Sequence, residues 1–228
     1  MNLTERHHAY IVLGFYKALT DRGPRGREAF VKAAQVYGES RGRRMAMRAI
    51  RDGRALDFTS YFAYSEWEAS EDAFDSVFEA LPGCVDERVT RCPWAEVFAG
   101  EEALACGLLY CGEIDRAIVR GFNPALTLDV ASVQHDGGCC QFYFRDDGIG
   151  PDLFARAEAL PRGTCVREFA YHCADAWRAF SNVAVSVFGP AEGERIIADA
   201  EACVAGSAGG EVLETVRQYD GVNFDQVS

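Results

Sequence analysis

The stretch YGESRGRRMAMRAIRDG, residues 37–53, decides how this chain folds. With the preceding REAFVKAAQV it predicts one long helix over about 25–52, with apolar residues such as Phe30 along one side. Gly38 and Gly42 lie inside this helix, where each glycine costs about 1 kcal/mol relative to alanine. Two explanations stay open: another backbone packs closely against the glycines, or the helix breaks near one of them.

The same region carries an unusual concentration of positive charge. Ten of the 23 basic residues of the chain lie between positions 22 and 54, whereas the whole chain has a net charge of −12. Either this basic helix pairs with the acidic remainder, or some of its arginines face a pocket and hold an anionic ligand. The strong negative charge of the whole excludes a nucleic-acid partner, which requires a basic face.

Composition sets the broad class of protein. The 228 residues are 49% hydrophobic and 25% charged, which excludes a disordered chain or a coiled-coil rod. No apolar run approaches the roughly 20 residues that a membrane-spanning helix needs, so we expect no membrane partner. The nine cysteines are odd in number, contain no Cys-x-x-Cys pair and follow no secretory signal. We therefore expect reduced thiols in a cytoplasmic protein.

Local patterns predict the remaining elements. An amphipathic helix opens the chain, and residues 58–67 form either a strand or a short helix. The other expected elements are a helix over 71–80 that ends at Pro82-Gly83, a strand over 85–91, a helix from Pro93, a helix over 101–120, a helix over about 165–188 with Thr164 as its N-cap, a helix from Pro190, and a flexible link over 205–210.

A hairpin is the clearest strand signal. Residues 125–134 and 139–145 flank Asp136-Gly137, and a two-residue loop there places Asp129 opposite Phe144. A three-residue loop would exchange the faces. Together the elements predict an α+β fold: a small, mostly antiparallel sheet packed with helices. We expect one domain over 1–228. Its segments are an N-terminal helical segment (1–54), a core with the sheet (55–146) and C-terminal helices (147–228).

Several reactive side chains are predicted to converge. Cys111 and Asp115 are four apart on the predicted 101–120 helix and so share a face. Cys92 at a strand end, Cys140 on the hairpin and His135 at its tip could reach that face. Three hypotheses stay open. In the first, the thiolates of Cys92, Cys111 and Cys140 hold a divalent metal such as zinc. In the second, one thiol is a nucleophile activated by Asp115 or His135, and in the third the cysteines only fill the core.

Glu66 is a second candidate for chemistry. It lies in the aromatic stretch that ends in Trp67, and burial there would raise the pKa of its carboxyl group into the range suited to acid–base catalysis. The alternative is an ordinary glutamate that faces solvent.

The order of these motifs resembles the L-2-amino-thiazoline-4-carboxylic acid hydrolase family over about residues 30–145. The resemblance rests on Tyr37-Gly38, RGRRM at 41–45, Glu66-Trp67, Cys92-Pro93, Cys111 with Asp115, and Cys140 with Phe142. It implies hydrolysis of a carbon–nitrogen or carbon–sulfur bond in a cyclic amidine, since the namesake substrate opens to a carbamoyl-cysteine.

The resemblance also implies roles for residues. The catalytic residues would be Cys111, Asp115, Glu66 and His135. A small-molecule substrate that carries a carboxylate would be bound by Arg41, Arg44 and Trp67. Assembly into a homo-oligomer is also possible for such a protein. The cysteine and hairpin pattern is also similar to 4-vinyl-reductase-type domains. That likeness keeps open a non-catalytic sensor that binds a small molecule or a metal.

Overall fold

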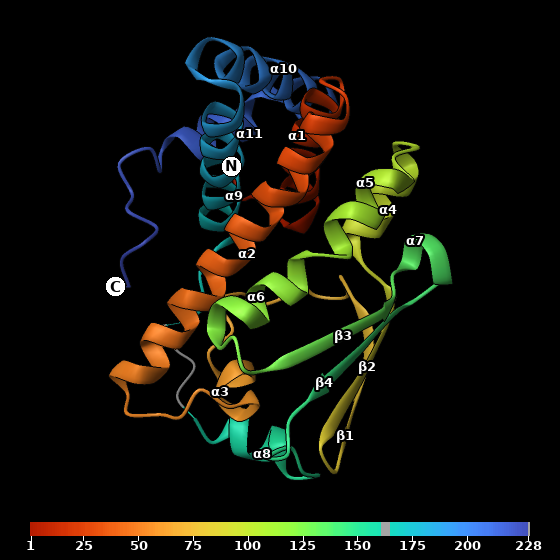
Figure 1. The fold of residues 1–228 in the computed structure, drawn as a ribbon, viewed down its shortest axis with the longest axis vertical. Helices are drawn as coiled ribbons and strands as arrows, with labels where there is room; N and C mark the ends of the chain where they lie inside the picture. Colours follow the sequence, from red (N-terminus) through yellow and green to blue (C-terminus); the bar gives the residue numbers. More distant parts are fainter. Residues whose placement is uncertain (161–164, 228) are drawn as a thin grey trace.

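The computed structural model describes residues 1–160 and 165–227, and it has the predicted α+β fold: a helical bundle joined to a small antiparallel sheet (Figure 1). The elements are α1 (Glu5–Thr20), α2 (Pro24–Arg51), α3 (Phe58–Ala63), β1 (Asp75–Leu81), β2 (Cys84–Arg91), α4 (Pro93–Gly100), α5 (Leu104–Cys111), α6 (Ile114–Phe122), β3 (Thr127–Ser132), α7 (Gln134–Gly137), β4 (Cys140–Arg145), α8 (Leu153–Glu158), α9 (Phe169–Phe188), α10 (Pro190–Ala208) and α11 (Gly210–Arg217).

The long helix α2 is unbroken, and its glycines serve close packing against α6. A Cβ atom built on Gly42 would lie 2.0 Å from the carbonyl oxygen of Ile118, and one on Gly38 would lie 2.7 Å from the Cβ of Ala117. Gly121 of α6 meets the backbone of Glu39 in return. The first explanation is therefore confirmed: the glycines let two helix backbones approach where no side chain would fit.

The sheet has the strand order β1-β2-β4-β3, with every neighbouring pair antiparallel. One of its faces packs on helices, where Phe58 of α3 and Val119 of α6 join Val85, Phe142 and Phe144 in a buried apolar cluster. A second cluster fills the bundle formed by α1, α2, α9, α10 and α11. Helices α2 and α6 lie between the two parts (Figure 1).

The helix predicted over 71–80 is wrong, because this segment is strand β1. Pro82 and Gly83 form a two-residue turn that pairs Leu81 with Cys84, and Gly83 has a φ of +73°. Proline followed by a glycine with positive φ is the signature of a type II turn. The two residues therefore join two strands instead of ending a helix. The alternative over 58–67 resolves to the short helix α3.

The helix predicted over 101–120 is also wrong, since it is two helices that break at Gly112 and Glu113. Cys111 ends α5 and Asp115 lies in the first turn of α6, so they do not share one helix face. Glycine has low helix propensity, which permits the change of direction.

The predicted hairpin register is wrong as well. Leu128, not Asp129, lies opposite Phe144, because the connection holds the helical turn α7 and β3 has an irregularity between Val130 and Ser132.

Two helix ends in the C-terminal part differ from expectation. Helix α9 begins at Phe169 with Glu168 as its N-cap, while the predicted cap Thr164 lies outside the described residues. Helix α10 continues to Ala208, so the expected link over 205–210 shortens to Gly209, whose φ of +95° ends the helix. The strand over 85–91 and the helix start at Pro93 are confirmed as β2 and α4.

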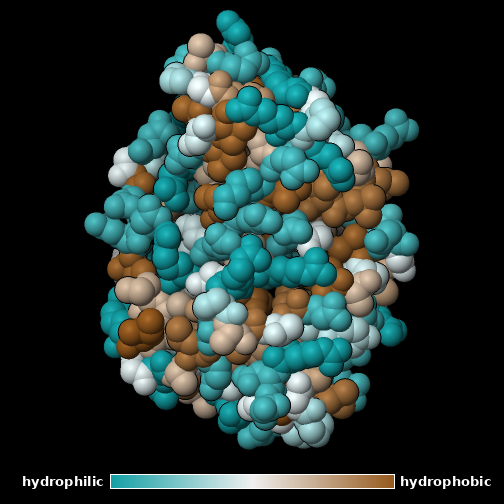
Figure 2. Space-filling view, viewed as in Figure 1, coloured by the Kyte–Doolittle hydropathy of each residue, from teal (hydrophilic) through white to brown (hydrophobic). Residues whose placement is uncertain are grey.

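The surface of the face in Figure 2 is mostly polar, with hydrophobic atoms gathered over the corner formed by α4 and α5. Leu104 and Leu108 of α5 are exposed there. No helix in the described part of the chain is long and apolar enough to cross a membrane.

We expect Gly42→Ala to lower the free energy of unfolding by about 2 kcal/mol or more, because the added methyl group collides with the backbone of α6. Gly206→Ala is the matched control. It lies on the exposed side of α10, where an added Cβ meets nothing within 4 Å, so helix propensity alone should stabilise the protein by up to about 1 kcal/mol. Urea unfolding of the two variants measures both changes. Equal stability of the two variants would contradict the close contact.

Candidate functional site

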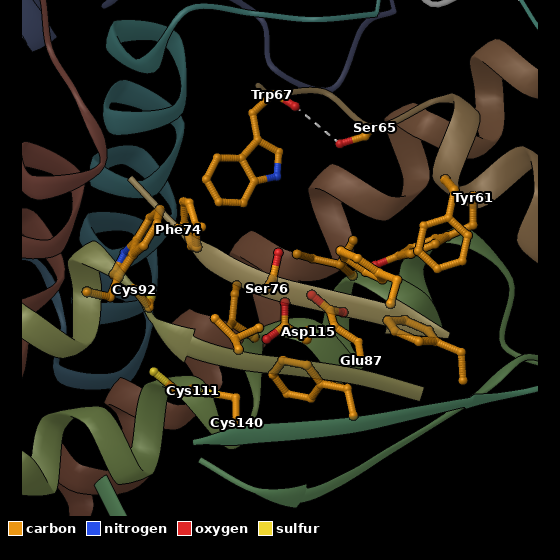
Figure 3. Close-up of a pocket in the computed structure, with 18 of the residues that line it drawn as sticks. Tyr61, Ser65, Trp67, Phe74, Ser76, Glu87, Cys92, Cys111, Asp115 and Cys140 are labelled. Atoms are coloured by element: carbon orange, nitrogen blue, oxygen red, sulfur yellow. Dashed lines mark hydrogen bonds between the residues drawn. The ribbon is translucent and has the colours of Figure 1, made fainter. Parts of the chain in front are cut away.

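A cavity of about 270 Å³ lies between the inner face of the sheet and helices α2, α3 and α6 (Figure 3). Most of its wall is aromatic or aliphatic. The lining residues are Arg41, Met45, Tyr61, Phe62, Ser65, Trp67, Phe74, Ser76, Phe78, Glu87, Val89, Cys92, Trp94, Tyr110, Cys111, Ile114, Asp115, Ile118, Cys140, Phe142 and Phe144. An apolar pocket with a few convergent polar groups is the usual form of a small-molecule site.

Two carboxyl groups point toward each other in the middle of this cavity, Asp115 from the first turn of α6 and Glu87 from β2 (Figure 3). Burial raises the pKa of Asp115 to about 6, against the opposing effect of Arg41. Burial also raises the pKa of Glu87, and the nearby Asp115 carboxylate raises it further, to about 8. The two carboxyl groups titrate as a coupled pair, in which Asp115 ionises first and Glu87 keeps its proton to higher pH. Such a pair can both accept and donate a proton.

Arg41 supplies the positive charge of the cavity. The residue is only 7% exposed, and its guanidinium lies over the ring of Trp67 at 5.5 Å from the centroid. Its Nε makes no hydrogen bond within the described residues. The nearest carboxylate oxygen with which it pairs is that of Glu66, at a long 4.0 Å. A buried guanidinium with free donor capacity is suited to bind an anion.

The structure brings the three predicted sulfurs to this same cavity. Cys92, Cys111 and Cys140 all line it together with Asp115, although they come from separate elements (Figure 3). Burial raises the pKa of Cys92 to about 11 and that of Cys140 to about 12. Burial also raises the pKa of Cys111 well above its usual value, with further contributions from the other two sulfurs and Asp115. All three are neutral thiols near pH 7.

These residues do not fit a metal ion. Within residues 1–160 and 165–227, no three His, Cys, Asp or Glu side chains are arranged so that they could hold one. The zinc site expected from Cys92, Cys111 and Cys140 finds no support in their geometry.

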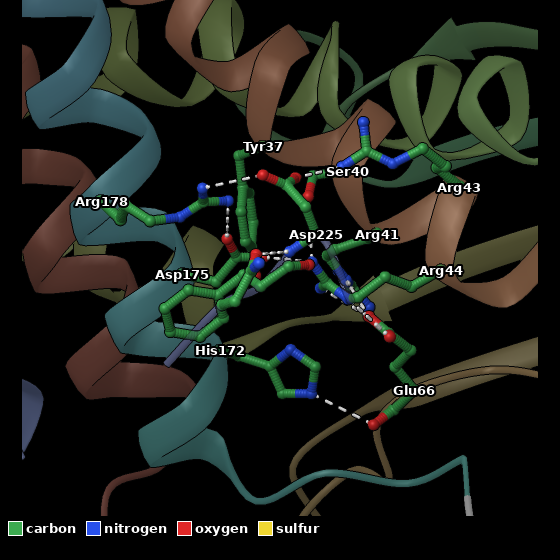
Figure 4. A network of polar contacts seen from close by, with 12 residues as sticks. Tyr37, Ser40, Arg41, Arg43, Arg44, Glu66, His172, Asp175, Arg178 and Asp225 are labelled. Atoms are coloured by element: carbon green, nitrogen blue, oxygen red, sulfur yellow. Dashed lines mark hydrogen bonds and ion pairs between the residues drawn. The ribbon is translucent and has the colours of Figure 1, made fainter. Parts of the chain in front are cut away.

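Glu66 and Arg44 lie outside the cavity, in a buried ion cluster (Figure 4). Both oxygens of Glu66 accept hydrogen bonds of 2.8 Å from Arg44, and one accepts a 2.6 Å bond from Arg48. Arg44 also pairs with Asp175 of α9 at 2.8 Å. None of the four residues is more than 1% exposed. Pairing of the basic helix with acidic partners is confirmed for Arg44 and Arg48. Arg41 lines the cavity, and an anionic ligand held there stays a prediction.

The expectation of a raised pKa for Glu66 is wrong. Burial alone would raise it, but the hydrogen bonds and charge of Arg44, helped by His172 and Arg41, lower the pKa of Glu66 to about 2. A carboxylate fixed in its ionised form by two guanidinium groups is a poor proton carrier. The geometry assigns Glu66 to holding the arginines in place.

Glu87 is the cavity residue that the sequence interpretation missed, although a signal for it exists. It lies between Val85 and Val89 in the alternating strand β2, so the strand pattern places it on the buried face with them. A charged residue in that position of a half-buried strand is unusual and indicates a partner or a function.

A second missed group is His8, which is buried beside the cavity wall. It accepts a hydrogen bond from the indole of cavity-lining Trp94 at 3.1 Å, and its other ring nitrogen contacts the hydroxyl of Tyr37 at 3.0 Å. This network fixes the rings against which Arg41 is placed. No local sequence pattern distinguishes His8 from the adjacent His7.

Comparison with known families now bears on this site. The family model for L-2-amino-thiazoline-4-carboxylic acid hydrolase matches residues 4–144. The chain belongs to this family. Every residue that lines the cavity falls inside the matched region, which ends with β4. No curated protein and no solved structure shows significant similarity to the chain.

We expect Glu66→Gln to lower the free energy of unfolding by about 3–5 kcal/mol at pH 7, because it leaves Arg44 and Arg48 buried without a carboxylate. The pKa of Glu66 is lower in the folded than in the unfolded protein, so its stabilisation is present above about pH 4.5 and is lost as the pH falls toward 2. Urea unfolding across this range should show the difference between wild type and variant shrinking.

Glu96→Gln serves as the control for a surface charge. Glu96 pairs with Arg6 in an exposed salt bridge, and such pairs contribute little. A Glu66→Gln variant as stable as this control at pH 7 would contradict the role assigned to the cluster.

Proposed function

We propose that this protein is a hydrolase that opens the ring of a small cyclic amidine of the thiazoline type, one that carries a carboxylate. Membership of the family supports the reaction class. One observation carries the proposal: Arg41, Asp115 and Glu87 face a single, otherwise largely apolar cavity. Its positive and negative groups complement a ligand that has a carboxylate at one end and a basic amidine at the other.

Substrate binding follows from the charges in the cavity. Arg41 donates hydrogen bonds from its guanidinium, including the unpaired Nε–H, to the ligand carboxylate, while Trp67 keeps the guanidinium plane in position. The ionised Asp115 then lies close to the amidine, whose nitrogens are hydrogen-bond donors. The cavity volume of about 270 Å³ lies near the lower end of the usual range for ligand sites, consistent with a small substrate.

The reaction needs one base and one acid. Water must add to the ring carbon between the two heteroatoms, and a proton must reach the heteroatom that leaves. Asp115, ionised at neutral pH, takes the proton from water, and protonated Glu87 gives a proton to the leaving atom. Because the two groups are neighbours, the proton gained by Asp115 restores Glu87 after each turnover.

We predict a bell-shaped dependence of kcat/KM on pH, with limbs near pH 6 and pH 8, for ring opening of 2-amino-thiazoline-4-carboxylate. Below pH 6 Asp115 becomes protonated and loses its role as base; above pH 8 Glu87 loses the proton that it donates. Asp115→Asn should reduce kcat by about 10²–10⁴-fold. Glu87→Gln should do the same and remove the alkaline limb while keeping the acidic one.

Asp86→Asn is the matched control for these variants. Asp86 precedes Glu87 on β2, and its carboxylate accepts a hydrogen bond from Gln141 rather than lining the cavity. Its activity and pH profile should equal those of wild type. An unchanged profile in Asp115→Asn or Glu87→Gln would overturn the proposed acid–base pair.

We predict that Arg41→Met raises KM about 10- to 100-fold, since it removes charge-assisted hydrogen bonds to the substrate carboxylate. Loss of the positive charge should also move the acidic limb to higher pH, because Arg41 lowers the pKa of Asp115. The carboxamide analogue of the substrate lacks the anion, so wild type and Arg41→Met should turn it over with similar KM.

Arg43→Met provides the control, because Arg43 is exposed and pairs with Asp225 near the C-terminus. Equal penalties for the acid and its carboxamide in Arg41→Met would show that Arg41 does not read the carboxylate.

The second candidate function is non-catalytic binding of a small molecule. The aromatic wall of the cavity and its neutral thiols favour it. Turnover and calorimetry on wild type and Asp115→Asn distinguish the two functions. An enzyme turns over the substrate in the wild type and loses turnover in Asp115→Asn, whereas a binding protein binds the ligand without any turnover in the wild type.

The setting of the protein is also a proposal. The eight cysteines other than Cys165 are free thiols in the described residues, which supports a reducing, cytoplasmic location. The partner that we propose is the small-molecule substrate. Assembly into a homo-oligomer stays a prediction.

A further inference from the structure

Cys111 is a cavity-lining cysteine that contacts an imidazole. Its Sγ lies 3.9 Å from Nε2 of His135, and His135 itself does not line the cavity. The sulfur therefore stands between the ligand space and the imidazole. A nucleophile backed by a base on the side away from the substrate is the arrangement that activates thiols and hydroxyls in covalent catalysis.

The fold holds this imidazole in place from several sides. Gly107 of α5 lies against the ring so closely that a Cβ there would be 2.1 Å from Nε2. The ring of Phe98 packs on it with centroids 5.9 Å apart. The turn that carries His135 is capped by Asp136, which accepts a hydrogen bond from the backbone N–H of Val133 at 3.0 Å. A side chain placed by two neighbouring helices and a capped turn is preorganised for one contact.

Both members of the pair are neutral at pH 7, and burial alone opposes transfer of the proton from sulfur to nitrogen. Burial lowers the pKa of His135, against the opposing effect of Asp136, so the imidazole is neutral at pH 7 and Nε2 can accept. The thiol is neutral as well and donates. A cationic amidine in the cavity would favour the thiolate, because a nearby positive charge stabilises it.

We propose that Cys111 is the nucleophile of the ring-opening reaction and that His135 is its base. This inference rests on the proposed function and adds a covalent step to it. Sγ forms a bond to the amidine carbon as the thiol proton passes to Nε2 of His135. The bond from that carbon to the ring heteroatom breaks, and the heteroatom keeps the electron pair and takes the proton of Glu87.

Water completes the reaction. Asp115 takes a proton from water as its oxygen bonds to the same carbon, and the bond from carbon to Sγ then breaks. The sulfur leaves with the electron pair and recovers its proton from His135. The net change is the addition of one water molecule to the ring, with no oxidant or reductant consumed.

Alkylation by 2-chloroacetamidine tests the nucleophile apart from turnover. This amidine forms a carbon–sulfur bond with a thiol and releases chloride. Peptide mass spectrometry after short exposure of the full chain should find Cys111 labelled at least tenfold faster than the other eight cysteines. His135→Ala should slow this labelling tenfold or more. Cys106→Ala, a buried cysteine of the same helix outside the cavity, should leave the rate at Cys111 unchanged.

Turnover of 2-amino-thiazoline-4-carboxylate supplies the second readout. Cys111→Ala and Cys111→Ser should lose at least 10³-fold in kcat while keeping the circular dichroism spectrum and melting temperature of Cys106→Ala. Near-normal turnover in a folded Cys111→Ala variant would overturn the nucleophile and leave the proposed hydrolysis standing. Equal labelling of all cysteines, or no effect of His135→Ala on labelling, would overturn it too. Selective labelling in a wild-type protein that hydrolyses no cyclic amidine would support the reactive pair and reject the proposed function.

Discussion

The close approach of α2 and α6 is the constraint on which the site depends. Gly38 and Gly42 remove the side chains that would otherwise separate the two helices. Arg41 lies between these glycines in the sequence, and Asp115 lies in the first turn of α6. Bringing the backbones together therefore fixes the two charged groups of the cavity relative to each other. Two glycines inside a long helix lower its stability relative to alanine. The close contact that they permit packs the two helices together and also places Arg41 and Asp115 at the cavity.

A second constraint decides which arginine is available to a ligand. Three buried arginines, Arg41, Arg44 and Arg48, face two buried carboxylates, Glu66 and Asp175, and Asp175 also pairs with the half-buried Arg178. Positive charge therefore exceeds negative charge among the buried groups. Arg44 and Arg48 take the short contacts, and the excess remains on Arg41 beside the cavity. Burying a charge without a partner is costly, so this excess favours an anion in the cavity.

The sequence predicted the elements that obey one strong local rule. The amphipathic pattern identified α1 and α2, alternation identified β2, and the motif order identified the family.

Cys111 and Asp115 were selected on the assumption of one continuous helix, which the break at Gly112 contradicts. Both residues nevertheless reach the cavity, because two helix ends meet there. Strand β1 was missed because Pro82-Gly83 can end a helix or join two strands, and only pairing with β2 distinguishes the two. Glu66 was misjudged because its arginine partners come from another element, which no local pattern shows.

Residues of the C-terminal part, beyond the family match, hold the charged groups next to the cavity in place. Asp175 of α9 pairs with Arg44, and the backbone carbonyl of Phe224 near the C-terminus accepts a 3.1 Å hydrogen bond from the same guanidinium. These contacts hold Arg44 on Glu66, and Glu66 in turn is kept from pairing closely with Arg41. No described residue after position 144 lines the cavity, yet the contacts of Asp175 and Phe224 hold Arg44 on Glu66 and leave Arg41 facing the cavity. The C-terminal helices act on the site through charge distribution, not through contact with the substrate.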